Sequence, residues 1–326
     1  MNTIALLGAG FSKNWGGLLA IDVREDLVSR LAHTAPDLVD RLRTGPNYED
    51  LLAQIQSEHA TQNTPATRAR LQNLQDAISA AFDAMNRAFE AAHFELSNAV
   101  QYSIRQFLSR FDAIFTTNQD LLLELHYNSV ELFNNPERPV RWQGWYLPGV
   151  TPPPNGGLMA PNWEKLIAIW HPTNNFQLIP ASQPVFKLHG STRWRAQDGT
   201  DLMIVGRNKD AQIAQIQILS WYFEQFGLYL MKPDTRIMAI GYSFSDRHID
   251  QAIADAYAAN QQIGIFYFGP RGRNVLNKNP PGTIPNDHDH VCYNVRLLGE
   301  NTHDLRQTFS TDHMAFDNVS RFFQTS

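Results

Sequence analysis

The chain has 326 residues, of which 43% are hydrophobic and 18% charged, so it has ample material for a core and is not a disordered protein. Its 27 basic and 32 acidic residues give a formal charge of −5, which argues against direct nucleic-acid binding through a basic face. A single cysteine, Cys292, excludes an internal disulfide and a zinc site made of several thiolates. No apolar run is long enough to span a membrane and no basic leader is evident, so we expect a cytoplasmic protein.

Five short apolar runs predict strands that are buried on both faces of a sheet. In chain order they are Thr3–Leu7, Ala113–Thr117, Val185–Leu188, Arg236–Ile240 and Ile263–Phe268. A helical pattern over Asp246–Ala259 separates the last two. This alternation predicts an α/β fold with a Rossmann-like open parallel sheet, in a single domain over residues 1–326.

Between the first two strands lie roughly ninety residues more than a simple crossover needs. Apolar side chains recur there at intervals of three or four residues, in a set that we call the apolar stripe: Leu71, Leu74, Ile78, Phe82, Met85, Phe89, Ala92, Leu96, Val100, Ile104 and Phe107. We therefore predict a helical insertion over residues 37–107, with a turn at Thr61–Thr67 and either one long helix or two helices broken near Ala92. The apolar stripe would either cover the sheet or form a subunit contact or a lid.

A second insertion is predicted over residues 134–184, where ten of the 18 prolines and four tryptophans fall. The run Pro152–Pro154, followed by Asn155-Gly156-Gly157, fits neither the inside of a helix nor a central strand. Tryptophans at this density are unusual in a disordered linker. We therefore expect an irregular but packed excursion beside the end of the sheet that carries the site.

Glycine and polar residues follow the first predicted strand in the run Gly8-Ala9-Gly10-Phe11-Ser12. Small residues let the backbone approach a pyrophosphate, and the following helix offers free N–H groups, so this run predicts a phosphate-binding turn. The dehydrogenase fingerprint requires a third glycine where this chain has Lys13. Its ribose-binding acid also has no counterpart, because Asp22, Glu25 and Asp26 fall in a predicted helix. A hydride-transferring enzyme is therefore a poor match.

Three later strands are also followed by polar residues, at the edge of the sheet where ligands bind in open α/β folds. These residues are Asn118 and Asp120 after the second strand, His189 with Gly190 and Ser191 after the third, and Gly241 and Ser243 after the fourth. A histidine beside glycine at a strand end favours a catalytic role for His189. Asp120 would either cap the next helix or serve the site, and Ser245 or Asp246 would cap the helix after the fourth strand.

Taken together, these motifs resemble those of the sirtuin-like family of NAD-consuming proteins. The family's glycine-alanine-glycine-x-serine motif and its following glycine match Gly8, Ala9, Gly10, Ser12 and Gly16; its asparagine-x-aspartate motif matches Asn118 and Asp120; its histidine-glycine-serine motif matches His189, Gly190 and Ser191; and its glycine-x-serine motif matches Gly241 and Ser243. The chain lacks the four-cysteine zinc ribbon of the protein deacylases, and Leu18–Ile21 stand near the place of their proline-aspartate-phenylalanine-arginine element. What remains resembles the bacterial sirtuin-like NAD hydrolases of antiphage defence.

The resemblance implies that NAD is the substrate, and no zinc or other metal is expected. It implies that Asn118 and His189 are the catalytic residues, with Gly8–Ser12 holding the pyrophosphate and Gly241–Ser243 the adenosine half of NAD. Transfer of this kind is weaker for Asp120, Asp246 and Arg247. For an NAD hydrolase of this class we expect control by assembly, as a homo-oligomer or with a HerA-type ATPase or a short Argonaute.

Three other functions stay open on the residues alone. The same pocket would suit an NAD-dependent protein deacylase, or it would only bind a nucleotide and act as a scaffold for a partner. A nuclease is the third alternative, with a metal bound by Asp287-His288-Asp289-His290 in the loop Asn279–His290. Because that loop is rich in proline, asparagine and glycine, a solvated loop without metal is the favoured interpretation.

Overall fold

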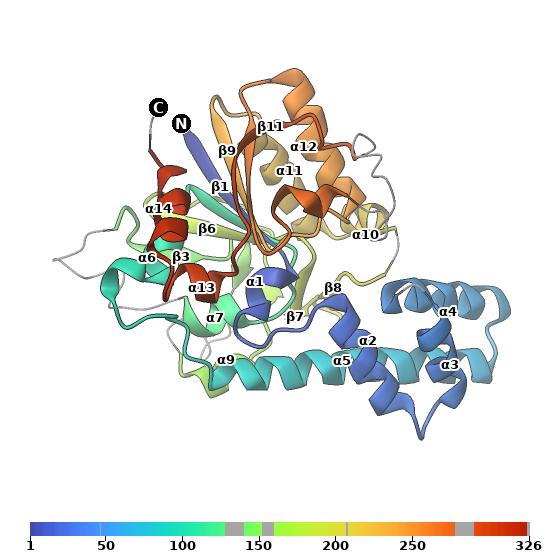
Figure 1. The fold of residues 1–326 in the computed structure, drawn as a ribbon. Coiled ribbons are helices and arrows are strands. Elements are labelled where there is room, and N and C mark those ends of the chain that lie inside the picture. Colours follow the sequence, from blue (N-terminus) through green and yellow to red (C-terminus); the bar gives the residue numbers. More distant parts are fainter. Residues whose placement is uncertain (46, 128–139, 152–159, 207, 278–289, 325–326) are drawn as a thin grey trace.

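The chain folds around a parallel sheet whose strands follow the order β11-β10-β9-β1-β2-β6-β3 (Figure 1). The computed structural model describes residues 1–45, 47–127, 140–151, 160–206, 208–277 and 290–324. Within them the sheet consists of β1 (Asn2–Leu7), β2 (Ala113–Thr116), β3 (Gly144–Tyr146), β6 (Ser182–Lys187), β9 (Thr235–Ile240), β10 (Gly264–Phe268) and β11 (Arg296–Asn301). All neighbouring strands of this sheet run parallel. The predicted α/β fold with a Rossmann-like sheet is confirmed.

The five predicted strands are all present, as β1, β2, β6, β9 and β10. The sequence does not predict β3 and β11, which lie at the two edges of the sheet. Strand β3 has only three residues, inside the proline- and tryptophan-rich insertion. In β11 the side chain of Leu297 is 44% exposed, so this edge strand lacks the continuous apolar run that marks a strand buried on both faces.

Aromatic side chains fill the core beside the sheet. Phe115 of β2 and Phe186 of β6 are paired in register and stack with ring centroids 4.8 Å apart. Phe226 of α11 (Gln217–Leu230) packs against Phe115 at 5.0 Å. Around α6 (Ile104–Leu108), Phe107 packs against Phe309. Within the described residues, no helix combines the length and the hydropathy needed to cross a membrane.

A crevice is expected between β1 and β9, because the direction of strand order reverses there. From β1 the chain builds β2, β6 and β3 on one side and then returns to add β9, β10 and β11 on the other. Ligands of open α/β sheets bind at such a switch point, outside the carboxyl ends of the strands. The backbones meet closely there: Gly241 has a φ of +60°, and a Cβ on it would lie 2.3 Å from the carbonyl carbon of Gly10. Glycine is therefore required at position 241.

Four helices between β1 and β2 form what we call the helical arm: α2 (Ala20–Leu31), α3 (Pro36–Thr44), α4 (Tyr48–Gln62) and α5 (Pro65–Glu90). The arm projects to one side of the sheet (Figure 1). Helix α4 ends where Asn63 adopts a left-handed conformation, and the Thr64 side chain caps α5. The turn therefore lies within the predicted segment Thr61–Thr67. The long helix ends at Glu90, close to the predicted break at Ala92.

The apolar stripe is part of the core along α5. Leu74, Ile78, Phe82, Met85 and Phe89 are all at most 7% exposed. Helix α5 packs against α2 and α4 of the helical arm, and its last part contacts α7 (Leu122–His126) and α9 (Asn162–Ile167). The stripe therefore joins the helices of the arm to one another instead of covering the central sheet. The alternative that the stripe forms a subunit contact is therefore wrong at these buried positions.

The proline- and tryptophan-rich insertion is packed where it is described. It contains β3, the short pair β4 (Val150–Thr151) and β5 (His171–Pro172), and α9. Trp145 and Trp170 are buried, whereas Trp163 is 57% exposed on α9. The run Pro152–Pro154 and the glycines that follow it lie outside the described residues.

Candidate functional site

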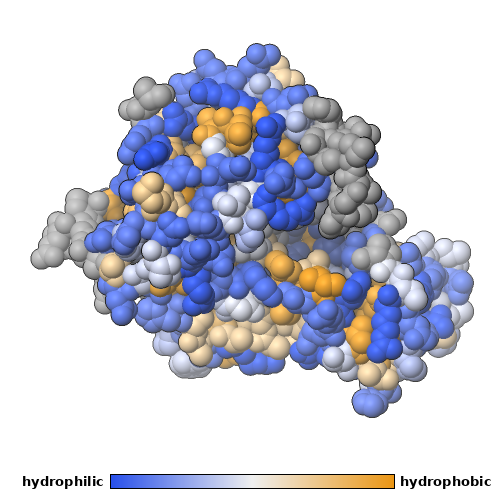
Figure 2. All heavy atoms as spheres, viewed as in Figure 1, coloured by the Kyte–Doolittle hydropathy of each residue, from blue (hydrophilic) through white to orange (hydrophobic). Residues whose placement is uncertain are grey.

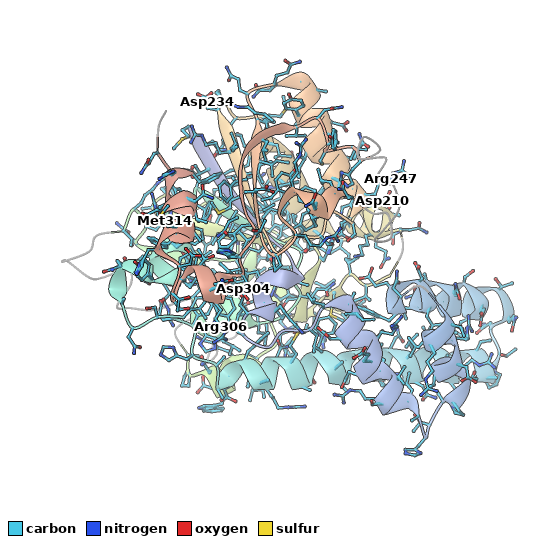
Figure 3. The ribbon with its side chains drawn as sticks, in the orientation of Figure 1. Asp210, Asp234, Arg247, Asp304, Arg306 and Met314 are labelled. Atoms are coloured by element: carbon cyan, nitrogen blue, oxygen red, sulfur yellow. The ribbon has the colours of Figure 1, made fainter. Side chains whose placement is uncertain are left out.

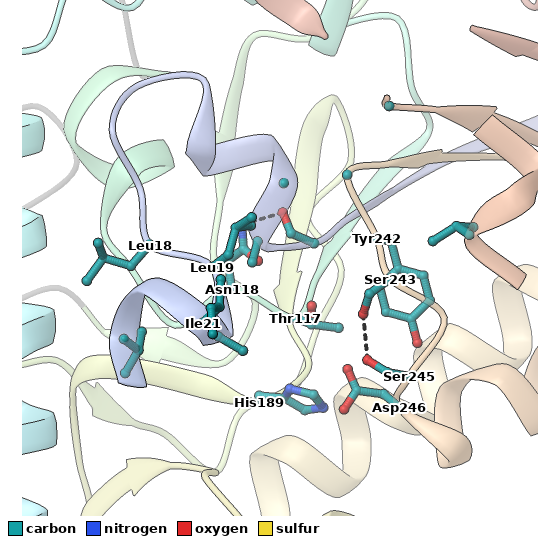
Figure 4. A pocket seen from close by; sticks show the side chains of 18 of the residues that line it. Leu18, Leu19, Ile21, Thr117, Asn118, His189, Tyr242, Ser243, Ser245 and Asp246 are labelled. Atoms are coloured by element: carbon teal, nitrogen blue, oxygen red, sulfur yellow. Dashed lines mark hydrogen bonds between the residues drawn. The ribbon is translucent and has the colours of Figure 1, made fainter. Parts of the chain in front are cut away.

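A cavity of about 610 Å³ opens at the carboxyl ends of β1, β2, β6 and β9 (Figure 4). The following predicted site residues line it: Gly8, Ala9, Gly10, Asn118, Asp120, His189, Gly241 and Ser243. Ser12 is buried behind this wall, and Gly16 lines a smaller neighbouring cavity of about 360 Å³. The fold thus brings together residues from all four sequence motifs.

The glycine-rich turn after β1 is tied to β9 by its own backbone. The N–H of Gly8 donates to the carbonyl oxygen of Ile240 (3.1 Å), and the N–H of Gly10 donates to that of Gly241 (2.9 Å). Helix α1 (Ala9–Lys13) starts at this turn. The two glycines therefore allow β1 and β9 to approach closely, and their N–H groups are hydrogen-bonded to the backbone at the end of β9. The N–H groups of Gly8 and Gly10 are therefore not among the free groups that the sequence predicts for phosphate.

The side chain of Asn118 has a single orientation set by hydrogen bonds. Its Nδ2 donates to the carbonyl oxygen of Gly8 (2.9 Å) and to Oγ of Ser12 (3.0 Å). Ser12 in turn donates to Oδ2 of Asp120 (2.7 Å). Because both amide hydrogens of Asn118 are used, its oxygen Oδ1 remains to bind a ligand or a water molecule.

Asp120 lines the cavity and also binds the backbone at the start of α7. Besides accepting the hydrogen bond from Ser12, it accepts one from the backbone N–H of Leu122 at the start of α7 (3.0 Å). The next residue, Leu121, donates its N–H to Oδ1 of Asn86, which is fully buried on α5 of the helical arm (2.9 Å). The arm therefore helps to hold the loop that carries Asn118 and Asp120.

His189 lies in the tight connection between β6 and β7 (Gly190–Arg195) and is 2% exposed. Its Nε2 lies 3.2 Å from Nε2 of His248, the second residue of α12 (Arg247–Ala259). The ring also has a hydrogen bond with the backbone of Thr117. Burial lowers the pKa of His189 to about 3, although Asp246 and Thr117 act in the opposite direction. The imidazole is therefore neutral at neutral pH.

A partly buried ion triad borders the same cavity. Nζ of Lys209, at the start of α10 (Lys209–Gln215), lies 2.8 Å from Oδ1 of Asp246 and 3.1 Å from Oε2 of Glu49 on α4. Burial lowers the pKa of Lys209, but Asp246 and Glu49 outweigh this and raise it above its ordinary value. For Asp246, burial raises the pKa, whereas His189 and Lys209 lower it to a net value below its ordinary one.

The predicted capping role of Asp246 is wrong. Asp246 precedes α12, but its side chain makes no cap bond there; its Oδ1 accepts a hydrogen bond from Nζ of Lys209. Ser245 pairs with Ser243 instead (Oγ–Oγ 2.5 Å). Arg247 is exposed on the outside of the molecule, near Asp210, and does not line the cavity (Figure 3).

Three further members of the site were not predicted: Glu49, Lys209 and His248. Glu49 and Lys209 follow no predicted strand, and His248 lies beyond the fourth predicted strand, inside the predicted helix Asp246–Ala259. The three residues come from different helices that meet only in the folded chain. His189, Asp246 and His248 form a possible metal-binding group, with one potential ligand atom each within 4.8 Å of the others. Of the run Asp287–His290, which the sequence offered as a metal site, residues 287–289 lie outside the described residues. The remaining residue, His290, lies 3.3 Å from the carboxylate of Asp250.

The wall opposite the sheet is apolar and comes from the helical arm. Leu18, Leu19 and Ile21 lie at the start of α2 and face the cavity (Figure 4). Phe82 and Met85 of α5 extend this wall. Figure 2 shows apolar atoms in orange near the start of α2, between the sheet and the helical arm. The cavity thus has a polar floor of strand ends and an apolar cover.

Comparison with known proteins gives one family. A model of the SIR2-like domain matches residues 112–280, which is more than half of the chain and includes the segments with Asn118, His189 and Gly241. No curated protein matches the sequence. The family match indicates an NAD-related function and is consistent with an NAD-dependent enzyme.

Proposed function

Because the chain belongs to the SIR2-like domain family, we propose that it is an NAD hydrolase, which cleaves the bond between nicotinamide and ribose. The products would be nicotinamide and either ADP-ribose or a cyclised form of it. The observation that carries this proposal is the convergence of Asn118 and His189 at one cavity, at the switch point of the sheet. The family match alone does not distinguish hydrolysis from deacylation.

The proposed reaction needs little help at its leaving group. Nicotinamide in NAD is already a cation, so when the glycosidic bond breaks, its electron pair neutralises the ring without prior protonation. The transition state at the ribose carbon resembles an oxocarbenium ion. Water then forms the new bond to this carbon and loses one proton.

Asn118 and His189 have complementary tasks in this scheme. The free Oδ1 of Asn118 would orient the ribose hydroxyls or the water, since both of its amide hydrogens are used by the protein. Nε2 of His189 would accept the proton from water and pass it to solvent. A well-placed general base contributes about 100- to 10,000-fold in rate. His189 is neutral at neutral pH, as a proton acceptor must be, and its pKa of about 3 makes it a weaker base than an ordinary histidine.

The rest of NAD would follow the line of the strand ends. Gly8–Gly10 would lie against the pyrophosphate, and Gly241 and Ser243 would contact the adenosine half. Ser12 and Asp120 would act indirectly, because they hold Asn118. The apolar wall formed by Leu18–Ile21 would keep bulk water away from the nicotinamide ribose.

Chromatography of NAD products with purified protein tests this proposal. We expect nicotinamide and ADP-ribose, or its cyclised form, from the wild type and no turnover by Asn118→Ala or His189→Ala, with both variants folded by circular dichroism. His33→Ala, at an exposed position away from the cavity, is the matched control and should keep wild-type turnover. Wild-type turnover by either site variant would remove that residue from the mechanism.

The same experiment separates the alternative functions. Formation of O-acetyl-ADP-ribose with an acetylated peptide would favour a deacylase. Absence of any NAD loss, with or without a natural partner, would favour a nucleotide-binding scaffold. DNA cleavage that requires a metal would favour a nuclease.

We also propose that the protein is an antiphage effector whose activity is restrained until it assembles. A constantly active NAD hydrolase would deplete the NAD of its own cell, so a restraint is needed if the hydrolase proposal is correct. The partner would be a second copy, a HerA-type ATPase or a short Argonaute. Sedimentation measured together with NAD turnover tests this: a wild-type chain that is monomeric and fully active alone would contradict it.

A further inference from the structure

Two histidines and an aspartate meet at the polar floor of the cavity, and the proposed hydrolysis uses only one of them. We propose that His189, His248 and Asp246 form a reversible binding site for Zn²⁺, and that the bound ion inhibits the protein. The site would be unrelated to a zinc ribbon, which needs several thiolates and is excluded by the single cysteine. The proposal departs from the expectation that no zinc is bound, which rests on the missing thiolate cluster.

The spacing of the two imidazoles matches a metal site. Nε2 of His189 and Nε2 of His248 lie 3.2 Å apart. Two nitrogen ligands of a tetrahedral Zn²⁺, each at about 2.0–2.1 Å, are separated by about 3.3 Å. The carboxylate of Asp246 offers a third ligand atom, within 4.8 Å of both nitrogens. The two histidines therefore need almost no movement to share an ion, and only Asp246 must approach.

The protonation of the two facing rings is also compatible with a bound cation. Two nitrogen atoms that face each other hold at most one proton between them when both rings are neutral. When each ring carries its single proton on Nδ1, with the proton between the rings exchanged through solvent, both Nε2 lone pairs are free to bind one Zn²⁺. The hydrogen bond between the His189 ring and the backbone of Thr117 is of the kind that orients metal-bound histidines.

The charges around the site favour a cation, but only moderately. Glu49 and Asp246 each carry a negative charge and Lys209 a positive one, so this triad has a net charge of −1. Lys209 occupies Oδ1 of Asp246, whereas Oδ2 has no hydrogen bond within the described part of the chain. The nearby ammonium group opposes a metal ion. It therefore makes the site suited to reversible binding.

The consequence for activity rests on the proposed function. The lone pair on Nε2 of His189 would be the proton acceptor in NAD hydrolysis, and the same lone pair would bind the metal. One lone pair serves one partner at a time, so Zn²⁺ binding and turnover would exclude each other. The metal would thereby act as a restraint on the resting enzyme.

Calorimetric titration of the metal-free full-length protein with Zn²⁺ tests the site without measuring activity. We expect one Zn²⁺ per chain in the wild type, and a loss of affinity of about 100-fold or more in His248→Phe and in Asp246→Asn, because loss of an outer partner alone costs about 10- to 100-fold. Phenylalanine suits position 248, since the ring there already packs against Phe223 (5.7 Å between centroids). His33→Ala is the control for surface histidines, and Mg²⁺ should not bind, because it prefers oxygen ligands.

A further variant, at Lys209, should increase the affinity for Zn²⁺ instead of lowering it. Lys209→Met removes the ammonium group beside Asp246, so Zn²⁺ should bind roughly tenfold more tightly. With Co²⁺ as a spectroscopic probe, the wild type should give visible d–d absorption that His248→Phe lacks. Superimposable Zn²⁺ titrations of the wild type, His248→Phe and Asp246→Asn would overturn the proposal.

Addition of NAD separates this proposal from the proposed function. Saturating NAD should weaken Zn²⁺ binding, and Zn²⁺ should inhibit turnover by the wild type. Zn²⁺ binding that depends on His248 and Asp246, in a protein that neither binds nor consumes NAD, would support the metal site and contradict the hydrolase. NAD turnover, together with Zn²⁺ binding that does not depend on His248 and Asp246, would support the hydrolase and contradict the metal site.

Discussion

The hydroxyl group of Ser12 donates a 2.7 Å hydrogen bond to the carboxylate of Asp120, although 108 residues separate them in the chain. This bond joins the glycine-rich turn after β1 to the asparagine-x-aspartate motif after β2. Asn118 binds the same hydroxyl oxygen, so the orientation of its amide depends on both partners. Two motifs that are separate in the sequence are thus one structural unit in the site.

Substitution of Asp120 should affect both stability and turnover. In Asp120→Ala, the Ser12 hydroxyl and the Leu122 N–H lose their acceptor, and each unsatisfied buried donor costs about 1–3 kcal/mol. Asp120→Asn keeps one acceptor oxygen, so its free energy of unfolding should fall less. Urea denaturation measures the first effect. NAD turnover should fall in both variants, because Asn118 loses its fixed partner; a fully stable and active Asp120→Ala would contradict this account.

Gly241 should tolerate no side chain. Its φ of +60° disfavours other residues, and a Cβ there would lie 2.3 Å from backbone atoms of Gly10 and Phe11. We expect Gly241→Ala to lower the free energy of unfolding by at least about 2 kcal/mol, from strain and forced separation of β1 from β9.

Gly227→Ala on helix α11 is the matched control for that change. Nothing lies within 4 Å of a Cβ at position 227, and alanine suits a helix interior better than glycine, so stability should rise by about 0.5–1 kcal/mol. Chemical denaturation of both variants gives the comparison. Equal effects at the two positions would show that the close contact at the switch point is unimportant.

The strands and the first residues of the site follow from local pattern. Both faces of β1, β2, β6, β9 and β10 are covered, so each appears as an apolar run with polar residues at its end. Asn118 and His189 are found because they occupy those ends. The same reasoning fails at the edge strands β3 and β11, where burial is incomplete or the strand is very short.

The ion triad has no such local pattern. Lys209 meets Glu49, 160 residues away in the chain, only after the helical arm folds beside the sheet, and it meets Asp246 across 37 residues. The sequence predicts that Ser245 or Asp246 caps α12, because both residues precede this helix. The Asp246 carboxylate instead binds Lys209 through Oδ1, and local sequence contains no information about that long-range partner.

Lys165 should make stability depend on pH in the alkaline range. Its side chain is buried on α9, and burial lowers its pKa from 10.5 to about 8, although Glu124 opposes this. Between these two values the unfolded chain binds more protons than the folded one, so this residue makes the free energy of unfolding rise with pH. At neutral pH the buried charge is a cost that Lys165→Met would remove.

We therefore expect Lys165→Met to have a higher melting temperature than the wild type at pH 7. The difference should shrink as the pH is raised from about 8 toward 10.5, where the lysine of the unfolded chain also loses its proton. Thermal melts of both proteins across this range measure it. A difference that is constant with pH would mean that Lys165 does not titrate as its burial implies.

Burial of the apolar stripe determines how much a charged substitution on α5 lowers the free energy of unfolding. Ile78 is 2% exposed on α5, whereas Ala88 is exposed on the same helix. Ile78→Asp places an unpaired carboxylate in the core and should lower the free energy of unfolding by about 3 kcal/mol or more. Ala88→Asp adds the same charge at the surface and should change it by no more than about 0.5 kcal/mol. Circular dichroism and urea denaturation check both variants: loss of structure in Ile78→Asp beside a folded Ala88→Asp fits a core position, whereas an Ile78→Asp as stable as the wild type would contradict the burial of the stripe.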